Sequence, residues 1–178
     1  MSESLSVVIP AYNEEANIAK SITYVYDCLK KLGIKDYEVI VVNDGSRDKT
    51  GEIAKSFLSK FSNLIIIENK PNRGYGGALK TGFYRATKKL VVMSHADNQF
   101  DLMELPKLMQ LQKQSNADIV CGIRSDRKDS ILRKLNGWMW NTLVRGLFGY
   151  LAEDIDCGFK LFKQTVFAKV NIPSNGAM

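Results

Sequence analysis

The sequence has few cysteines, and they are not arranged for cross-linking or for binding a metal. The three, Cys28, Cys121 and Cys157, are widely spaced and form no C-x-x-C pair. This argues against a disulfide framework or a zinc site and is typical of a reducing compartment. The sequence also lacks an apolar run near the roughly 18 residues that span a bilayer. Its first residues lack the basic flank and apolar stretch of a signal peptide. We therefore expect a cytoplasmic protein.

Acidic residues are missing from one long stretch. Between residues 69 and 96 all of the charged residues are Lys or Arg. A second basic stretch runs from Arg124 to Arg145. The chain has a net charge of +6. This excess favours an anionic partner, such as a nucleotide diphosphate, a lipid phosphate, an anionic membrane surface or a nucleic acid, although a solvated basic face accounts for it as well. Nucleic acid is the weakest of these, because no motif that reads it accompanies the charge.

The length of 178 residues, 45% of them hydrophobic, suits one domain with one core. Short β-branched runs alternate with helical patterns, which predicts an α/β fold with a mainly parallel sheet flanked by helices. Asn13 and Asp101 are expected to cap helices. Ligand-binding loops gather at the carboxyl ends of parallel strands, so segments 10–14, 43–46 and 94–100 are candidates for the site. The expected strands are residues 5–9, 37–42, 64–67, 90–93 and 117–121.

Apolar residues recur at helical spacing over about residues 131–150, interleaved with basic ones. Both tryptophans, Trp138 and Trp140, lie in this stretch. A basic amphipathic helix rich in Trp and Phe is typical of a membrane interface, and a helix docked on the sheet is an equal alternative.

The segment S-H-A-D-N-Q-F, residues 94–100, follows the fourth expected strand. It places the carboxylate of Asp97 and the amide oxygen of Gln99 two residues apart at the end of a strand, where both can bind one metal ion. Oxygen ligands of this kind, together with phosphates and waters, are what Mg²⁺ or Mn²⁺ prefers. Such residues are also common in turns, so a turn without a metal is the alternative.

Two further segments have features of nucleotide sites. Asp44, at the end of the second expected strand, can accept hydrogen bonds from ribose hydroxyls or a base edge, or can simply form a turn. The run N-R-G-Y-G-G, which includes Arg73, precedes a helix and suits anions through its backbone N–H groups. It does not have the form G-x-G-x-x-G and begins several residues beyond its strand, which argues against a dinucleotide-binding dehydrogenase.

Taken together, these segments resemble family 2 glycosyltransferases, and most of all their polyprenyl-phosphate branch, which includes dolichol-phosphate mannose synthase. The resemblance rests on S-V-V-I-P-A-Y-N-E-E, E-V-I-V-V-N-D-G-S-x-D-x-T, N-x-G-x-G-x-A-x-x-x-G, H-A-D-N-Q and D-I-D-C-G-F-K, in that order, and covers nearly the whole chain. It implies a GT-A fold with a Rossmann-like sheet, a UDP- or GDP-sugar donor, a divalent cation (Mg²⁺ or Mn²⁺) and inversion at the anomeric carbon.

The resemblance also implies roles for individual residues. Pro10, Tyr12, Glu14, Val42 and Asp44 match nucleotide-binding positions. Asp97 and Gln99 match the second Asp and the Gln of a D-x-D-x-Q metal motif. Arg124 and Arg133 match residues that hold the acceptor phosphate. Asp154 and Asp156 lie in the acceptor loop. Catalysis would involve Asp97 together with these last two carboxylates, which would orient a phosphate acceptor or act as base toward a hydroxyl acceptor.

The chain departs from the family pattern in three places. His95, its only histidine, stands where the motif has its first Asp, and an imidazole can still ligate Mn²⁺ while carrying less negative charge. Gly137 stands where the acceptor-phosphate pattern has Ser. The chain also stops where the family continues. We therefore expect one GT-A catalytic domain over residues 1–178, truncated at its C-terminus, with a nucleotide-sugar part (1–100) and an acceptor part (101–178).

The predicted function is inverting transfer of a sugar to a polyprenyl phosphate at the cytoplasmic face of a membrane. The alternatives are transfer to a hydroxyl of a cell-surface glycan and a catalytically impaired homologue that binds a nucleotide sugar. A nucleotidyltransferase is less well supported, because its glycine-rich basic loop would directly follow the first strand, where this chain has P-A-Y-N-E-E.

Overall fold

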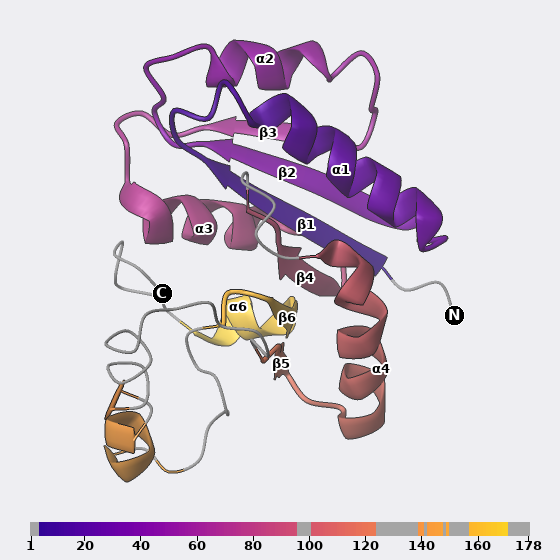
Figure 1. The fold of residues 1–178 in the computed structure, drawn as a ribbon, viewed down its shortest axis with the longest axis vertical. Helices are drawn as coiled ribbons and strands as arrows, with labels where there is room; N and C mark the ends of the chain where they lie inside the picture. Colours follow the sequence, from indigo (N-terminus) through magenta and orange to yellow (C-terminus); the bar gives the residue numbers. More distant parts are fainter. Residues whose placement is uncertain are drawn as a thin grey trace.

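A mixed sheet forms the centre of the computed structural model, which describes residues 4–95, 101–123, 139–140, 142–147, 149 and 157–170 (Figure 1). Its strand order is β3-β2-β1-β4-β6-β5. The first four strands of the chain are mutually parallel, and β6 runs antiparallel to both of its neighbours. The strands are β1 (Ser4–Ala11), β2 (Asp36–Asn43), β3 (Leu64–Glu68), β4 (Leu90–Met93), β5 (Ile119–Cys121) and β6 (Lys160–Lys163).

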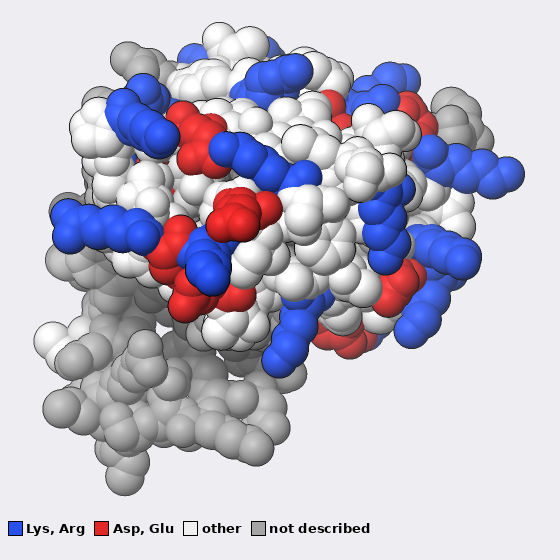
Figure 2. All heavy atoms as spheres, turned by 90° about the horizontal axis from the view of Figure 1, so that it is seen from above, with Lys and Arg blue, Asp and Glu red and all other residues white. Residues whose placement is uncertain are grey.

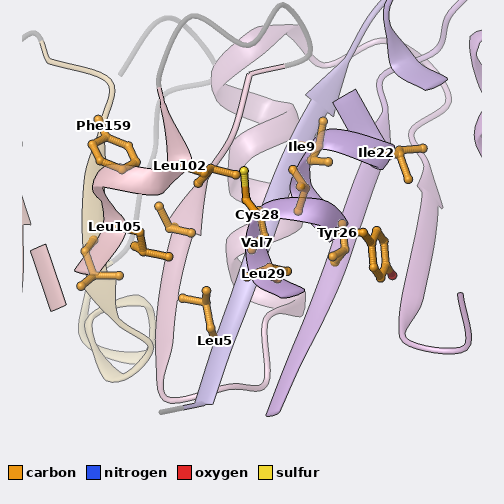
Figure 3. Packing of buried hydrophobic residues seen from close by; sticks show 14 of the residues in the cluster. Leu5, Val7, Ile9, Ile22, Tyr26, Cys28, Leu29, Leu102, Leu105 and Phe159 are labelled. Carbon is orange, nitrogen blue, oxygen red and sulfur yellow. The ribbon is translucent and has the colours of Figure 1, made fainter. Parts of the chain in front are cut away.

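Helices cover both faces of the sheet, with α1 and α2 on one face and α3 on the other (Figure 1). Successive residues of β1 point to opposite faces, so Leu5, Val7 and Ile9 pack beneath α1 while Val8 packs beneath α3. Figure 3 shows the first of these layers, in which the side chains of β1 meet those of α1. The helices are α1 (Ile18–Lys31), α2 (Thr50–Ser56), α3 (Gly74–Arg85), η1 (Leu102–Glu104), α4 (Leu105–Ser115) and α6 (Thr165–Lys169).

The expected strands are all present, and the sheet adds one that was not expected. β6 lies between β4 and β5, so β5 does not pair with β4 directly. β1 also continues past its predicted end at residue 9, through Pro10 to Ala11. Pro10 has no N–H to donate, but the sheet loses no hydrogen bond through this. The backbone polar groups of Val8 and Pro10 point toward β4, and the last hydrogen bond on that side is from the Ser94 N–H to the Val8 carbonyl (2.8 Å).

Two helix expectations have different outcomes. Asp101 caps η1 as predicted, because its side chain accepts a hydrogen bond from the Met103 N–H. Asn13 does not begin α1, and the prediction for it was wrong. The residue lies in the left-handed region (φ 53°), and the helix starts at Ile18. Residues 12–17 therefore form a loop between β1 and α1.

α3 approaches the sheet closely at Gly82. A Cβ added there would lie 2.3 Å from Cγ1 of Val8 and 3.2 Å from Cγ2 of Val42, both on buried strands. Only a residue without a side chain fits at this crossing. The last glycine of the N-x-G-x-G-x-A-x-x-x-G pattern thus sets the distance between α3 and the sheet.

We expect Gly82→Ala to lower the free energy of unfolding by about 1–3 kcal/mol, because overpacking outweighs the roughly 1 kcal/mol of better helix propensity. Gly146→Ala is the matched control, since Gly146 is also helical and nothing lies within 4 Å of its added Cβ. Urea denaturation measures both. The steric explanation of Gly82 is wrong if the two variants are equally stable or if Gly82→Ala gains stability.

The predicted amphipathic helix is described only in part. Residues 139–140 and 142–147 are helical, and 131–138 lie outside the described residues. Met139, Trp140, Leu143 and Leu147 are each more than half exposed. Within the described ranges, no helix is long and apolar enough to cross a membrane.

The excess of positive charge does not form a continuous basic patch on the face of the molecule nearest α2. Figure 2 shows the molecule from above the view of Figure 1, the side on which α2 lies, and there Lys and Arg side chains alternate with Asp and Glu. Part of the basic stretch 69–96 is also neutralised, because Lys88 forms an ion pair with Asp36. Net charge by itself therefore does not locate an anion site.

Candidate functional site

Three loops follow the carboxyl ends of neighbouring parallel strands. β1 lies between β2 and β4, and the registers Ala11↔Asn43 and Val8↔Met93 bring the three strand ends to one edge of the sheet. These loops overlap the predicted segments 10–14, 43–46 and 94–100, although residues 10, 11 and 43 belong to strands and residues 96–100 lie outside the described part of the chain. The parallel arrangement therefore brings Asp44 and His95 to the same edge.

Asp44 lies at the junction of these loops and is almost completely buried, with 2% of its surface exposed. Its Oδ1 accepts a hydrogen bond from Nδ2 of Asn69 (2.7 Å), and the backbone N–H of Arg73 donates to both carboxylate oxygens (3.1 Å each). Its own N–H donates to the carbonyl of Ala11 (2.8 Å). Through its backbone N–H and its carboxylate together, Asp44 thus connects β1, β2 and the loop that leads into α3.

Asn69 and Asn72 are parts of this arrangement that the sequence reasoning did not single out. Nδ2 of Asn72 donates to the Asp44 carbonyl (2.7 Å). Gly45 has φ 70°, and an added Cβ would lie 2.9 Å from the backbone nitrogen of Asn72, so the two loops touch through their backbones. Asn69 is the first residue after β3, and its polar side chain at that position was the available signal.

The loop after β1 is held against the loop after β2. The Asn13 N–H donates to Oγ of Ser46 (3.0 Å), and Oδ1 of Asn13 accepts from the Arg47 N–H (2.9 Å). The Glu14 N–H donates to Oγ1 of Thr50 (2.7 Å). Tyr12, directly before these anchors, is 47% exposed. It is therefore available to a ligand at this edge.

The other predicted nucleotide residues differ in exposure. Pro10 is buried in β1, and the side chain of Val42 is wholly buried against α3. Any contact of Val42 with a nucleotide would have to come from its backbone. Glu14 is half-buried, and its Oε2 accepts a hydrogen bond from Nδ2 of Asn17 (2.9 Å). Arg73 is exposed at the start of α3.

His95 follows β4 and faces Tyr75 of α3. The two rings are stacked, with centroids 5.9 Å apart and an interplanar angle of 13°, and the Tyr75 hydroxyl lies 3.5 Å from Nε2. That hydroxyl also donates to the sulfur of Met93 (3.3 Å). His95, the first residue of the predicted metal motif, thus contacts Tyr75 in the glycine-rich run at the start of α3.

The remaining predicted site residues lie outside the described part of the chain: Asp97, Gln99, Arg124, Arg133, Asp154 and Asp156. Within that part, no cluster of three His, Cys, Asp or Glu residues could hold a metal ion. The donor set of the motif is nevertheless chemically suitable. A carboxylate, an amide oxygen and an imidazole nitrogen are ligands that Mn²⁺ accepts, and His95, the described member, lies at the shared edge.

The sequence matches the family model described as glycosyl transferase family 2 over residues 6–170. The chain belongs to glycosyl transferase family 2. The match begins in β1 and extends to the end of α6, so it includes all three loops at the site edge.

Relatives in this family include enzymes named for polyprenyl phosphates. A dolichyl-phosphate beta-glucosyltransferase of Trichomonas vaginalis is 34% identical over 89% of this chain and 52% of its own length. An undecaprenyl-phosphate 4-deoxy-4-formamido-L-arabinose transferase of Pectobacterium atrosepticum is 31% identical over 92% of this chain and 50% of its own. The chain spans about half the length of these curated relatives.

Solved structures show that the sheet and helices form a GT-A glycosyltransferase fold. A mannosyltransferase of Pyrobaculum calidifontis, in complex with GDP-Man and Mn²⁺, superposes with a TM-score of 0.68 at 20% identity, covering 95% of this chain and 47% of the other. A mannosyl-3-phosphoglycerate synthase of Rubrobacter xylanophilus gives 0.69 at 17% identity, covering 94% and 56%. This agrees with the fold expected from the sequence.

Proposed function

We propose that this chain is the donor-binding catalytic part of an inverting glycosyltransferase that moves a sugar from a UDP- or GDP-sugar to a polyprenyl phosphate. The observation that carries the proposal is the meeting of three loops at one sheet edge, with Asp44 and His95 on either side of β1. The names of the polyprenyl-phosphate relatives support the acceptor class.

The nucleotide side comprises Pro10, Tyr12, Glu14, Val42, Asp44 and Arg73. Exposed Tyr12 offers a ring on which a base can stack, and the bonds around Asn13 hold its backbone in place. The Asp44 carboxylate is buried and accepts hydrogen bonds from Asn69 and the Arg73 N–H, so it orders the backbone that would surround the nucleoside. Arg73, exposed at the start of α3, supplies positive charge for the diphosphate.

The diphosphate side comprises Asp97 and Gln99, with His95 as a third ligand for Mg²⁺ or Mn²⁺. A cation bound there would neutralise the charge that develops on the departing diphosphate. The replacement of the usual Asp by His95 lowers the negative charge around the ion. We expect Mn²⁺ to be bound more tightly than Mg²⁺, because imidazole nitrogen suits a transition metal better.

On the acceptor side, Arg124 and Arg133 would hold the phosphate of the lipid carrier. That phosphate is anionic at neutral pH, so its oxygen can attack the anomeric carbon in line without a strong general base. Asp154 and Asp156 would then orient the acceptor rather than deprotonate it. The exposed apolar side chains of residues 139–147 would meet the cytoplasmic face of the membrane that contains the acceptor.

A transfer assay tests this function with the purified protein in detergent. Each of a panel of UDP- and GDP-sugars is offered with Mn²⁺ and a short-chain polyprenyl phosphate, and lipid-linked sugar is measured. We expect one donor to give product and EDTA to suppress it. The controls are the matching polyprenol, which lacks the phosphate, and a free oligosaccharide. Transfer to the oligosaccharide alone would support a hydroxyl acceptor, whereas donor binding without transfer to either acceptor would indicate an impaired homologue.

A further inference from the structure

α3 and α6 pack against each other on the face of the sheet opposite α1 and α2 (Figure 1). The rings of Phe83 in α3 and Phe167 in α6 are stacked, with centroids 4.7 Å apart. The Tyr84 hydroxyl donates to the carbonyl of Val170, which directly follows α6 (2.9 Å). The two helices therefore form one continuous outer surface. We refer to it as the α3/α6 surface and define it as residues 70–89 and 165–170.

Neither segment of the α3/α6 surface contains an acidic residue. Its charged residues are Lys70, Arg73, Lys80, Arg85, Lys88, Lys89 and Lys169. Two acids border the surface, Asp36 and Asp118, and each is paired with a lysine. The helices on the other face carry acids as well as bases, among them Asp27 in α1 and Glu52 in α2, which agrees with the mixed charges in Figure 2. The α3/α6 surface is therefore the more suitable of the two faces for an anionic partner.

Apolar groups lie among these basic side chains. The buried residues of α3, such as Leu79 and Phe83, face the sheet. Lys80 and Tyr84 lie one turn apart on the opposite side of the helix, and Tyr84 is 45% exposed. Tyrosine rings and the long stems of lysine and arginine are typical of surfaces at the boundary between water and lipid, because each has an apolar body and a polar end. This composition favours a bilayer over a nucleic acid or an acidic protein.

A second segment with a similar composition lies on this side of the sheet. The helical residues 142–147 lie at the end of the molecule away from α2 (Figure 1). Leu143 and Leu147 in this helix are 53% and 68% exposed, and Arg145 is also exposed. The α3/α6 surface and this helix therefore offer a bilayer two contacts on one side of the protein.

α3 also reaches the edge of the sheet where the three loops meet. Its first turn contains Tyr75, whose ring stacks on His95 after the end of β4. Just after its last turn, the Thr87 N–H donates to Oε1 of Glu38, near the start of β2 (2.7 Å). The helix thus crosses the sheet from the edge with the loops to the opposite edge. A bilayer that lies along α3 therefore lies beside those loops as well.

We propose that the α3/α6 surface docks on a bilayer that contains anionic lipids. Lys80 and Arg85 approach the phosphates of the head groups, and the Tyr84 ring enters the interface between them. The inference rests on the proposed function, because an acceptor of the polyprenyl-phosphate class is held in a membrane. Docking along α3 places the loops that bind the donor beside the head groups, where the acceptor phosphate lies.

The test compares two double substitutions that remove the same charge from opposite faces. Lys80→Gln with Arg85→Gln alters the α3/α6 surface, and Lys20→Gln with Lys30→Gln is the matched control on α1, where both lysines are exposed. Co-sedimentation measures binding of the purified chain to vesicles of phosphatidylcholine alone and of equimolar phosphatidylcholine and phosphatidylglycerol. Each basic residue near an anionic surface contributes about fivefold in affinity, so we expect the first variant to bind the anionic vesicles about thirtyfold more weakly. The control should stay within about threefold of wild type, because salt screens charges on the far face.

Further outcomes distinguish a lipid surface from other anionic partners. The wild-type protein should bind phosphatidylcholine vesicles more weakly than anionic ones, and added salt should release it from the anionic ones. The inference is overturned if the wild type shows no preference for anionic vesicles, or if the two double variants lose equal affinity. Binding to a single-stranded oligonucleotide but not to vesicles would assign the surface to a nucleic acid and would overturn it as well.

Sugar transfer separates the docking surface from the proposed function. With a short-chain acceptor in detergent, Lys80→Gln with Arg85→Gln should transfer sugar at the wild-type rate, since no bilayer is present. With the acceptor in anionic vesicles at low lipid concentration, the rate of this variant should fall about tenfold or more. A wild-type chain that binds vesicles through this surface but transfers no sugar would support the docking surface and count against the proposed function. Transfer in detergent by a chain that does not bind vesicles would do the reverse.

Discussion

Replacement of Asp97 by alanine is expected to reduce metal-dependent sugar transfer by about a thousandfold, the scale on which a cation's charge stabilisation acts. Asp97 is the only carboxylate in the motif H-A-D-N-Q. Because His95 has replaced the other usual carboxylate, the loss of Asp97 would leave the motif without a negative ligand. Nucleotide binding in EDTA should stay within twofold of wild type, since that binding does not involve the cation.

The measurements are initial rates of transfer and a Mn²⁺ titration. Asn98→Ala is the matched control, because it alters the neighbouring polar residue and leaves the motif's charge in place. It should retain most activity. The metal assignment is wrong if Asp97→Ala keeps transfer within tenfold of wild type, or if both variants lose activity equally.

Replacement of Asp44 by alanine is expected to damage both the fold and the site. The change leaves the side-chain amide of Asn69 and the backbone N–H of Arg73 without an acceptor inside the protein. Each buried unpaired donor costs about 1–3 kcal/mol, so we expect the free energy of unfolding to fall by roughly 2–4 kcal/mol. Nucleotide affinity should fall at least about a hundredfold, because the loops after β2 and β3 lose the carboxylate that joins them beside the nucleotide.

Asp36→Ala is the control for this prediction. Asp36 begins β2 at the opposite edge of the sheet, and its carboxylate forms a partly exposed ion pair with Lys88, so its removal should change stability little and leave nucleotide affinity unchanged. Urea denaturation and calorimetric titration with UDP and GDP measure the two effects of Asp44→Ala. Loss of stability with nucleotide affinity retained would mean that Asp44 has only a structural role.

The parallel part of the sheet and the location of the site were predictable because their causes are local. Runs such as V-I-V-V (residues 39–42) are β-branched and apolar throughout, as strands buried on both faces must be, and polar residues follow them directly. Asp44 was recognised for that reason. Its carboxylate partners were not, because Asn69 and the Arg73 N–H come from a loop whose path depends on the packing of α3.

The sequence of β6 does not by itself predict a strand. Its sequence, K-L-F-K, has lysines at both ends and is too short to distinguish a strand from a loop. It is a strand because β4 and β5 offer backbone partners on both sides. The position of Asn13 has a similar cause. Its left-handed backbone is stabilised by Ser46 and Arg47, more than thirty residues away in the sequence.

The amino-acid sequence by itself determined the four parallel strands, the helices between them and the family, since these depend on periodicity and on motifs that can be read locally. Only the tertiary structure decided which polar groups meet. It seals the Asp44 carboxylate against Asn69 and Arg73, and it brings the Tyr84 hydroxyl to the carbonyl of Val170, so that α3 and α6 share one surface. The physical reason is that hydrogen bonds between distant residues form only after the apolar faces of α1 and α3 have docked on the sheet and brought their partners within reach.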